Sequence, residues 1–265
     1  MTAQPADTID PGDVLTELRS IVIDAITNHP RSQQKRIGPS EIGNPCDHCL
    51  AAKLAVWEKH EWGVPWLPTI GTAVHEWLET TLARHEFARI AATGSDSTEW
   101  LMEHTVNVGD IGGIPITGSC DLFHVPSGTV IDYKIVGAST LRKVKSSGPS
   151  DTYRTQANLY GRGWRRAGYT VNNVAIWFLP RNSVNLTDGI PWTAKYDESL
   201  ALAALRRANR INTNLECLAS LDTKARDAWI TNQARATDCW DCRRYPDQPH
   251  GAPAAKNSLI DLPTR

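Results

Sequence analysis

The sequence predicts an α/β protein in which helices flank a mixed central sheet. Three strand-like runs at residues 101–108, 114–125 and 129–136 are separated by turn signals, so we expect an antiparallel meander. A near-continuous apolar run at 171–179 follows a helical segment and fits a buried strand. Because helical periodicity occurs on both sides of these runs, the expected architecture is a sheet covered by helices.

Apolar residues recur at helical spacing through most of the remaining chain. Helices are therefore expected at 14–27, 69–90, 150–168, 197–219 and 223–236, with another that begins at Ser40 or Asn44 and carries 50–60, and with a short edge strand at 192–196. In domain terms, we expect a leader and helix at 1–36, one domain at 37–247, and a flexible tail at 248–265.

The composition excludes several classes of protein. Of the 265 residues, 41% are hydrophobic and 22% are charged, values that are ordinary for a globular protein. No apolar run is long enough to span a bilayer, and the polar, acidic N-terminus is not a secretory signal. These features predict a cytoplasmic protein without a membrane partner, located in the host cytoplasm if a phage encodes it.

The charge of the chain is unevenly distributed. A formal net charge of −1 counts against a nucleic-acid partner for the chain as a whole. Residues 134–166, however, hold eight Lys or Arg and a single acidic residue, Asp151. This window is either a solvated basic face or a surface that neutralises phosphates.

Two acidic residues and a lysine stand in strands that should be mostly buried. Asp121 lies in the second predicted strand, and Asp132 and Lys134 lie in the third. Period-two alternation puts Asp132 and Lys134 on one face, and the hairpin turn can bring Asp121 beside them. Because unpaired buried charges are costly, these residues form either a structural ion pair or an oxygen-rich Mg²⁺ or Mn²⁺ site suited to phosphodiester hydrolysis.

Four short motifs, in this order, resemble the PD-(D/E)XK nuclease superfamily and in particular its RecB-like branch. Gly71–His75 reads Gly-x-x-x-His, Gly118–Asp121 reads Gly-x-x-Asp, Asp132–Lys134 reads Asp-Tyr-Lys, and Gln156–Tyr160 reads Gln-x-x-x-Tyr. The resemblance implies a restriction-endonuclease-like core and a metal-dependent DNA nuclease.

The resemblance also implies roles for individual residues. The Mg²⁺ or Mn²⁺ ligands would be His75, Asp121, Asp132 and the backbone carbonyl of Tyr133. Gln156 and Tyr160, which share a helix face at i and i+4, would position Lys134 and the DNA backbone. The basic residues that could contact DNA are Arg142, Lys143, Lys145, Arg154, Arg162, Arg165 and Arg166.

Four of the six cysteines form two Cys-x-x-Cys pairs, Cys46 with Cys49 and Cys239 with Cys242. Together they could close an S₄ metal site that joins the two ends of the domain. The spacing alone favours Zn²⁺, whereas the resemblance to the iron–sulfur exonucleases of the fourth CRISPR-associated protein family favours a [4Fe–4S] cluster. That family places one cysteine early and three late, and this chain departs from the pattern. Cys120 and Cys217 are expected to be small buried apolar residues.

The leading hypothesis is a DNA exonuclease that acts on single strands or DNA ends. By analogy, it would serve phage or CRISPR-type recombination, replication or DNA processing, and would borrow a helicase or recombination partner, since a Gly-x-x-x-x-Gly-Lys-Ser/Thr loop is absent. A non-catalytic DNA-binding or assembly module with a metal staple is the alternative. A zinc-stapled structural protein is a third reading.

Overall fold

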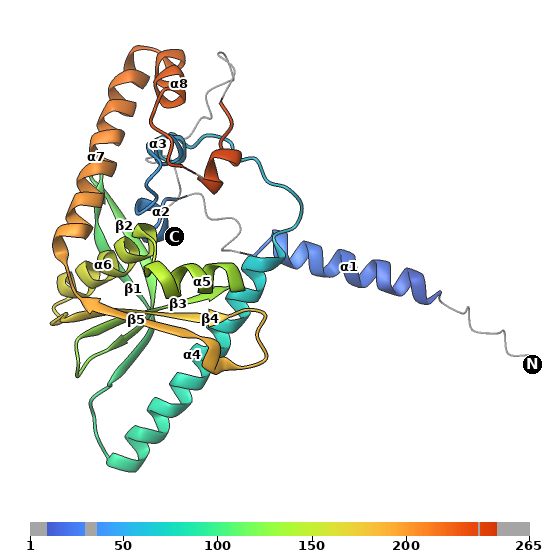
Figure 1. The fold of residues 1–265 in the computed structure, drawn as a ribbon, viewed down its shortest axis with the longest axis vertical. Helices are drawn as coiled ribbons and strands as arrows, with labels where there is room; N and C mark the ends of the chain where they lie inside the picture. The colour runs from blue at the N-terminus through green and yellow to red at the C-terminus, as the bar shows by residue number, and fades with distance from the viewer. Residues whose placement is uncertain (1–9, 30–35, 238, 248–265) are drawn as a thin grey trace, which may run out of the picture.

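A computed structural model describes residues 10–29, 36–237 and 239–247 (Figure 1). Residues 1–9 and 30–35 of the predicted leader and helix, residue 238, and the predicted tail at 248–265 lie outside the described residues. The elements in chain order are α1 Pro11–Thr27, α2 Pro39–Ile42, α3 Asp47–Leu54, α4 Trp66–Thr93, β1 Trp100–Ile111, β2 Ile114–His124, β3 Thr129–Val136, α5 Ala138–Ser147, α6 Asp151–Arg166, β4 Asn173–Pro180, the 3₁₀ turn η1 Leu186–Asp188, β5 Ile190–Lys195, α7 Glu198–Leu221, α8 Thr223–Thr231 and the 3₁₀ turn η2 Trp240–Arg243.

A five-stranded sheet in the order β1-β2-β3-β4-β5 forms the centre of the molecule. Neighbouring strands are antiparallel except β3 and β4, which are parallel. A parallel pair needs a crossover connection, and α5 and α6 supply it. The predicted meander, the mixed sheet and the flanking helices are therefore confirmed.

Helices cover the two faces of this sheet (Figure 1). On one face, Leu78 of α4 packs in a small cluster with Leu122, Tyr133 and Leu179. On the other face, α6 lies on the sheet and α7 packs against α6. Trp164 of α6 is completely buried there and anchors the main core. The strands that carry Asp121 and Asp132 thus run between two apolar layers.

The N-terminal and C-terminal parts of the domain meet beside α6 and α7. In Figure 1 the short helix α3 lies next to α8 and η2, although nearly the whole chain separates them in sequence. The backbone N–H of His60 donates to the carbonyl of Arg244 at 2.7 Å, and Asn44 Nδ2 donates to Asp241 Oδ2 at 2.8 Å. This arrangement confirms that helical parts from both ends join.

Three elements differ from the sequence prediction. The helix expected to reach residue 60 ends at Leu54, because Val56 takes a left-handed backbone conformation with φ 55°. The last predicted helix ends at Thr231 rather than at residue 236. Helix α5 was not predicted at all. Among the described residues, no helix is both long enough and apolar enough to cross a membrane.

Candidate active site and four-cysteine centre

The end of the β2–β3 pairing brings the predicted carboxylates together. The two strands pair over only three residue pairs, the last of which is Leu122 with Ile131, so Asp121 and Asp132 are the next residues beyond it. Asp121 Oδ2 accepts a hydrogen bond of 2.8 Å from the backbone N–H of Tyr133. Lys134 Nζ lies 2.6 Å from Asp132 Oδ2. Asp121 and Asp132 are both buried, so this is a desolvated group of charges.

Helix α4 contributes His75 to the same place. His75 Nδ1 lies 3.4 Å from Asp121 Oδ1 and 3.7 Å from Glu103 Oε1. Ligand atoms of these three residues lie within 4.8 Å of one another, close enough to share one metal ion. The ring of His75 also stands edge-on to the ring of Tyr133, with centroids 5.8 Å apart, which fixes the orientation of the imidazole.

Glu103 is a functional candidate that the sequence analysis missed. It lies on β1 between Met102 and His104, whose partners in β2 are Leu122 and Cys120, so it stands opposite Asp121. Its φ is 44°, a conformation that costs roughly 1–3 kcal/mol for a non-glycine residue and that tends to occur at functional sites. Ser119 Oγ holds the carboxylate by donating to Oε2 at 2.5 Å. Alignment of the first predicted strand with the second would have placed Glu103 opposite Asp121. No local sequence motif marks Glu103.

The local charges set different protonation states in the three central groups. Burial raises the pKa of Asp132 to about 6, even though the charge of Lys134 acts in the opposite direction. Burial also opposes ionisation of Asp121, but the hydrogen bond from His75 and the charge of Lys134 lower its pKa overall. Burial alone would lower the pKa of Lys134, yet Asp132 and Asp121 raise it. The site therefore combines Asp121, which favours the ionised form, and Lys134, which favours the protonated form, with Asp132, whose carboxylate takes up a proton more easily.

The predicted pair Gln156 and Tyr160 lies on the buried side of α6. The hydroxyl of Tyr160 interacts with Gln156, and it approaches Gly118 in β2. A Cβ placed on Gly118 would lie 2.7 Å from Pro39 Cδ and 3.2 Å from Tyr160 Oη. The first glycine of Gly-x-x-Asp thus lets α2 and α6 press against the strand that carries Asp121.

Two tyrosines complete the surroundings of the site. Lys134 Nζ lies 5.5 Å from the ring centroid of Tyr153, a cation–π contact that sequence reasoning did not anticipate. Tyr133, whose carbonyl is a candidate metal ligand, turns its ring to the α4 side and meets Trp177 edge-on at 6.3 Å. Lys134 is therefore positioned by Asp132 and Tyr153 together.

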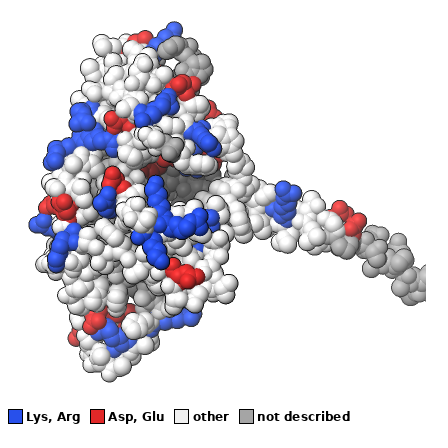
Figure 2. Space-filling model, in the orientation of Figure 1, with Lys and Arg blue, Asp and Glu red and all other residues white. Residues whose placement is uncertain are grey.

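The predicted DNA-binding residues fall into two groups. Arg142, Lys143 and Lys145 are exposed on α5, and we call them the α5 basic cluster. Figure 2 shows basic side chains gathered over the region where Figure 1 places α5. On α6, by contrast, Arg162 and Arg165 both pair with Glu198 of α7, at 2.5 and 2.6 Å.

The other two predicted DNA-binding residues on α6 are Arg154 and Arg166. Arg154 lies 2.5 Å from Asp151, an exposed pair within the helix, and Arg166 is exposed at the end of α6. Of the predicted DNA-binding residues, the α5 basic cluster follows most directly in the chain after the strand with Asp132 and Lys134, and its side chains are exposed.

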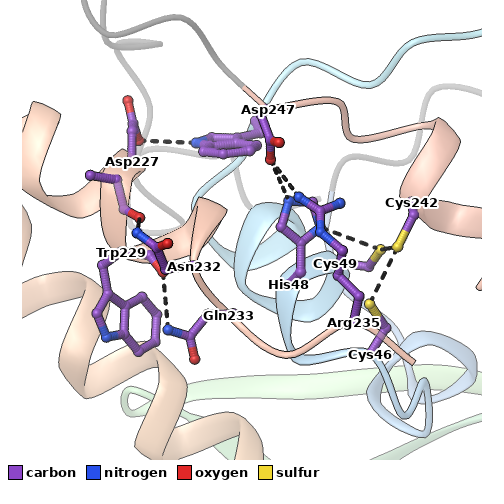
Figure 3. Close-up of polar contacts among 12 residues, drawn as sticks. Cys46, His48, Cys49, Asp227, Trp229, Asn232, Gln233, Arg235, Cys242 and Asp247 are labelled. Atoms are coloured by element: carbon purple, nitrogen blue, oxygen red, sulfur yellow. Dashed lines mark hydrogen bonds and ion pairs between the residues drawn. The ribbon is translucent and has the colours of Figure 1, made fainter. Parts of the chain in front are cut away.

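The four predicted metal-ligating cysteines converge from the two ends of the domain. Figure 3 shows three of them, Cys46, Cys49 and Cys242, with their sulfurs close together. Cys46 and Cys49 are buried at the start of α3, while Cys239 directly precedes η2, Cys242 lies within it, and both are half-buried. All four Sγ atoms lie within 4.8 Å of one another. Of the remaining two, Cys120 is buried as expected, but Cys217 is exposed on α7, which corrects the expectation that both would be buried.

Comparison with known proteins finds similarity only among solved structures. No protein-family model and no curated protein matches the sequence. An alkaline exonuclease from Laribacter hongkongensis is 14% identical, with 75% of this chain and 96% of that chain covered and a TM-score of 0.44. A phage-related exonuclease from Haemophilus somnus 129PT is also 14% identical, with 79% and 92% covered and a TM-score of 0.38. At these values, roles for residues rest on the geometry of this chain alone.

Proposed function

We propose that this chain is a Mg²⁺- or Mn²⁺-dependent deoxyribonuclease that acts as an exonuclease on single-stranded DNA or DNA ends. One observation carries the proposal: three carboxylates, one imidazole and one ammonium from four separate elements converge at the end of the β2–β3 pairing. A structural ion pair needs only Asp132 and Lys134, whereas the additional His75, Glu103 and Asp121 supply a set of metal ligands. The resemblance to RecB-like nucleases supports the same reaction class.

The donor set fits a hard divalent cation. The carboxylates of Asp121 and Glu103 supply oxygen, and His75 supplies one nitrogen within 4.8 Å of them, a mixture suited to Mg²⁺ or Mn²⁺. We add Asp132 to this set as the resemblance implies. Among the described residues, no group donates a hydrogen bond to Asp132 Oδ1, which leaves this buried oxygen available as a ligand. Such a cation, when bound, would polarise the scissile phosphate and lower the pKa of a bound water.

The protein's own residues would orient the reaction. Lys134, held between Asp132 and Tyr153, places a positive charge where the phosphate and the attacking water would lie. The backbone N–H of Tyr133 fixes the Asp121 carboxylate, and His75 fixes it from the α4 side. During hydrolysis the water gives up one proton as its oxygen bonds to phosphorus, the bond to one sugar oxygen breaks, and that oxygen takes up a proton.

Single substitutions test the site directly. The purified full-length chain should degrade end-labelled linear DNA with Mg²⁺ or Mn²⁺, and Asp132→Asn or Lys134→Ala should lower the rate at least about 100-fold, as loss of a group that acts on the transition state does. Glu103→Gln should also reduce the rate. Asp110→Asn, an exposed acid on the same strand as Glu103, is the matched control and should leave it unchanged.

Two outcomes would redirect the proposal. If the wild-type chain binds DNA but turns over none of it with either metal, the non-catalytic binding module becomes the better description. If Asp132→Asn and Lys134→Ala both keep wild-type rates, the proposed mechanism is refuted. Covalently closed circular DNA distinguishes the exonuclease from an endonuclease, because only the latter should cut it.

A further inference from the structure

The four-cysteine centre has sulfur–sulfur separations that distinguish a single ion from a cluster. Cys46 Sγ and Cys49 Sγ each lie 3.6 Å from Cys242 Sγ, and Cys49 Sγ lies 3.7 Å from Cys239 Sγ. Four thiolates arranged tetrahedrally around one Zn²⁺ at ~2.3 Å would be separated by ~3.8 Å. The observed distances match this arrangement closely.

A [4Fe–4S] cluster requires a wider opening. Each cysteine would bind a different iron at a different corner of the cluster, which places the thiolate sulfurs roughly 6 Å apart. Here all four sulfurs fall within 4.8 Å of one another, and Cys46 and Cys49 are held in a buried helix. The residues present therefore do not fit the cluster that the family resemblance implies.

From this geometry we infer that the four cysteines hold one Zn²⁺ ion in a closed, tetrahedral S₄ site. All four ligand positions come from protein side chains, so the ion has no open position for a substrate and serves the fold. This inference concerns a site apart from the proposed nuclease centre, and it stands or falls independently of that function.

The side chains of His48, Arg235 and Asp247 lie around the sulfurs and could stabilise a compact anionic metal centre (Figure 3). A Zn²⁺ ion with four thiolates carries an overall negative charge, and the guanidinium of Arg235 hydrogen bonds to Cys242. His48 is completely buried, and its Nδ1 lies 3.8 Å from Cys49 Sγ. Asp247 pairs with both of these residues, 2.5 Å from Arg235 and 3.4 Å from His48 Nε2. These partners orient the ligands, as outer groups do around protein metal sites.

The ion would also fasten the segment next to the nuclease site. Cys46 lies a few residues after α2, whose Pro39 faces Gly118 and whose Ile42 is completely buried. Arg207 of α7 adds a second attachment through Asp47, at 2.6 Å. Loss of the ion should therefore loosen α2 and α3 against β2 and α6, while the sheet itself remains.

The test begins with the wild-type chain produced and purified without oxygen from iron-rich cells, so that an iron–sulfur cluster can form if the site accepts one. We expect one zinc per chain, no iron, no acid-labile sulfide and a colourless protein. Four irons with four sulfides, one coloured iron, or no transition metal at all would each overturn the inference. The Asp121→Asn variant should keep its zinc, because a zinc that it loses would belong to the carboxylate site instead.

A second experiment assigns the ion to these cysteines. Cys242→Ser should lose the zinc and unfold at a lower temperature, while the matched control Cys217→Ser, at an exposed cysteine outside the site, should keep both zinc and stability. Should Cys242→Ser fail to fold, titration of the Cys217→Ser chain, which lacks the exposed thiol outside the site, with an organomercurial should release its zinc as four thiols react. Replacement of zinc by Co²⁺ should give the absorption bands of tetrahedral thiolate cobalt, and octahedral bands would contradict the proposed geometry.

Discussion

Gly118 and Gly71 are both glycines of the family-like motifs, yet the structure gives them opposite roles. A Cβ on Gly118 would lie 2.7 Å from Pro39 Cδ and 2.8 Å from Pro39 Cγ, and a proline ring cannot rotate away. We expect Gly118→Ala to destabilise the protein by about 1–3 kcal/mol, the usual cost of overpacking. Each kcal/mol should lower the Tm by about 2–4 °C in a domain of this size.

Gly71→Ala is the matched control. Gly71 lies inside α4, and a Cβ there would meet no atom within 4 Å. The substitution should therefore stabilise the protein by about 0.5–1 kcal/mol, because alanine loses less conformational freedom in a helix. Urea unfolding of both variants measures the two changes on one scale.

A double-mutant cycle identifies the contact responsible. Removing the ring with Pro39→Ala should recover part of the stability that Gly118→Ala loses, because the two residues then no longer collide. If Gly118→Ala unfolds at the wild-type urea concentration, or if Pro39→Ala recovers nothing, the close approach of α2 to β2 does not explain this glycine.

Two further predictions concern α4 and the α5 basic cluster. Glu86 accepts from Arg89 and from the backbone N–H of Glu99, and the Arg89 hydrogen bond is the main reason that its pKa falls from 4.5 to about 2. Glu86→Gln should thus lower the free energy of unfolding by about 1–2 kcal/mol at pH 7, more than Glu99→Gln does. In urea unfolding, this difference from the wild type should shrink as the pH falls from 4.5 towards 2. A difference independent of pH would contradict the prediction. Alanine at all three positions of the α5 basic cluster, in inactive Asp132→Asn protein, should weaken the binding of single-stranded DNA. It should also reduce the slope of the logarithm of the binding constant against the logarithm of salt concentration by about 2. Arg165→Ala, whose partner is Glu198, should change the affinity measured by fluorescence anisotropy much less, and equal effects would argue against α5 as the contact surface.

Local patterns carried the prediction of the sheet and of most of the site. Alternating apolar residues and turn signals located β1, β2 and β3, and Asp121 and Asp132 stood out because charges are rare in such strands. His75 was identified because Gly71–His75 resembles a family motif; its place on a predicted helix alone would not have singled it out. Each of these signals is contained in a few consecutive residues.

The features that were missed depend on contacts between distant residues. Helix α5 has only Leu141 and Val144 as substantial apolar residues, so its periodicity was too weak to detect. Glu103 gained meaning only from its register with β2 and from its unusual φ. Likewise, Glu198 removes two arginines from the predicted DNA surface through a contact with α7 that no local pattern reveals.

The short pairing of β2 with β3 has a consequence for which changes in chain length this protein can tolerate. The turn at 125–128 and the eight-residue pairing of β3 with β4 together set which residue of β3 stands next to Asp121. One deleted residue there would either pull β3 out of its register with β4 or break its short register with β2, and in both cases Asp121 and Asp132 would no longer lie side by side. Substitutions within the turn should be tolerated far better than changes in its length, because the length of the turn helps to set the distance between the carboxylates of Asp121 and Asp132.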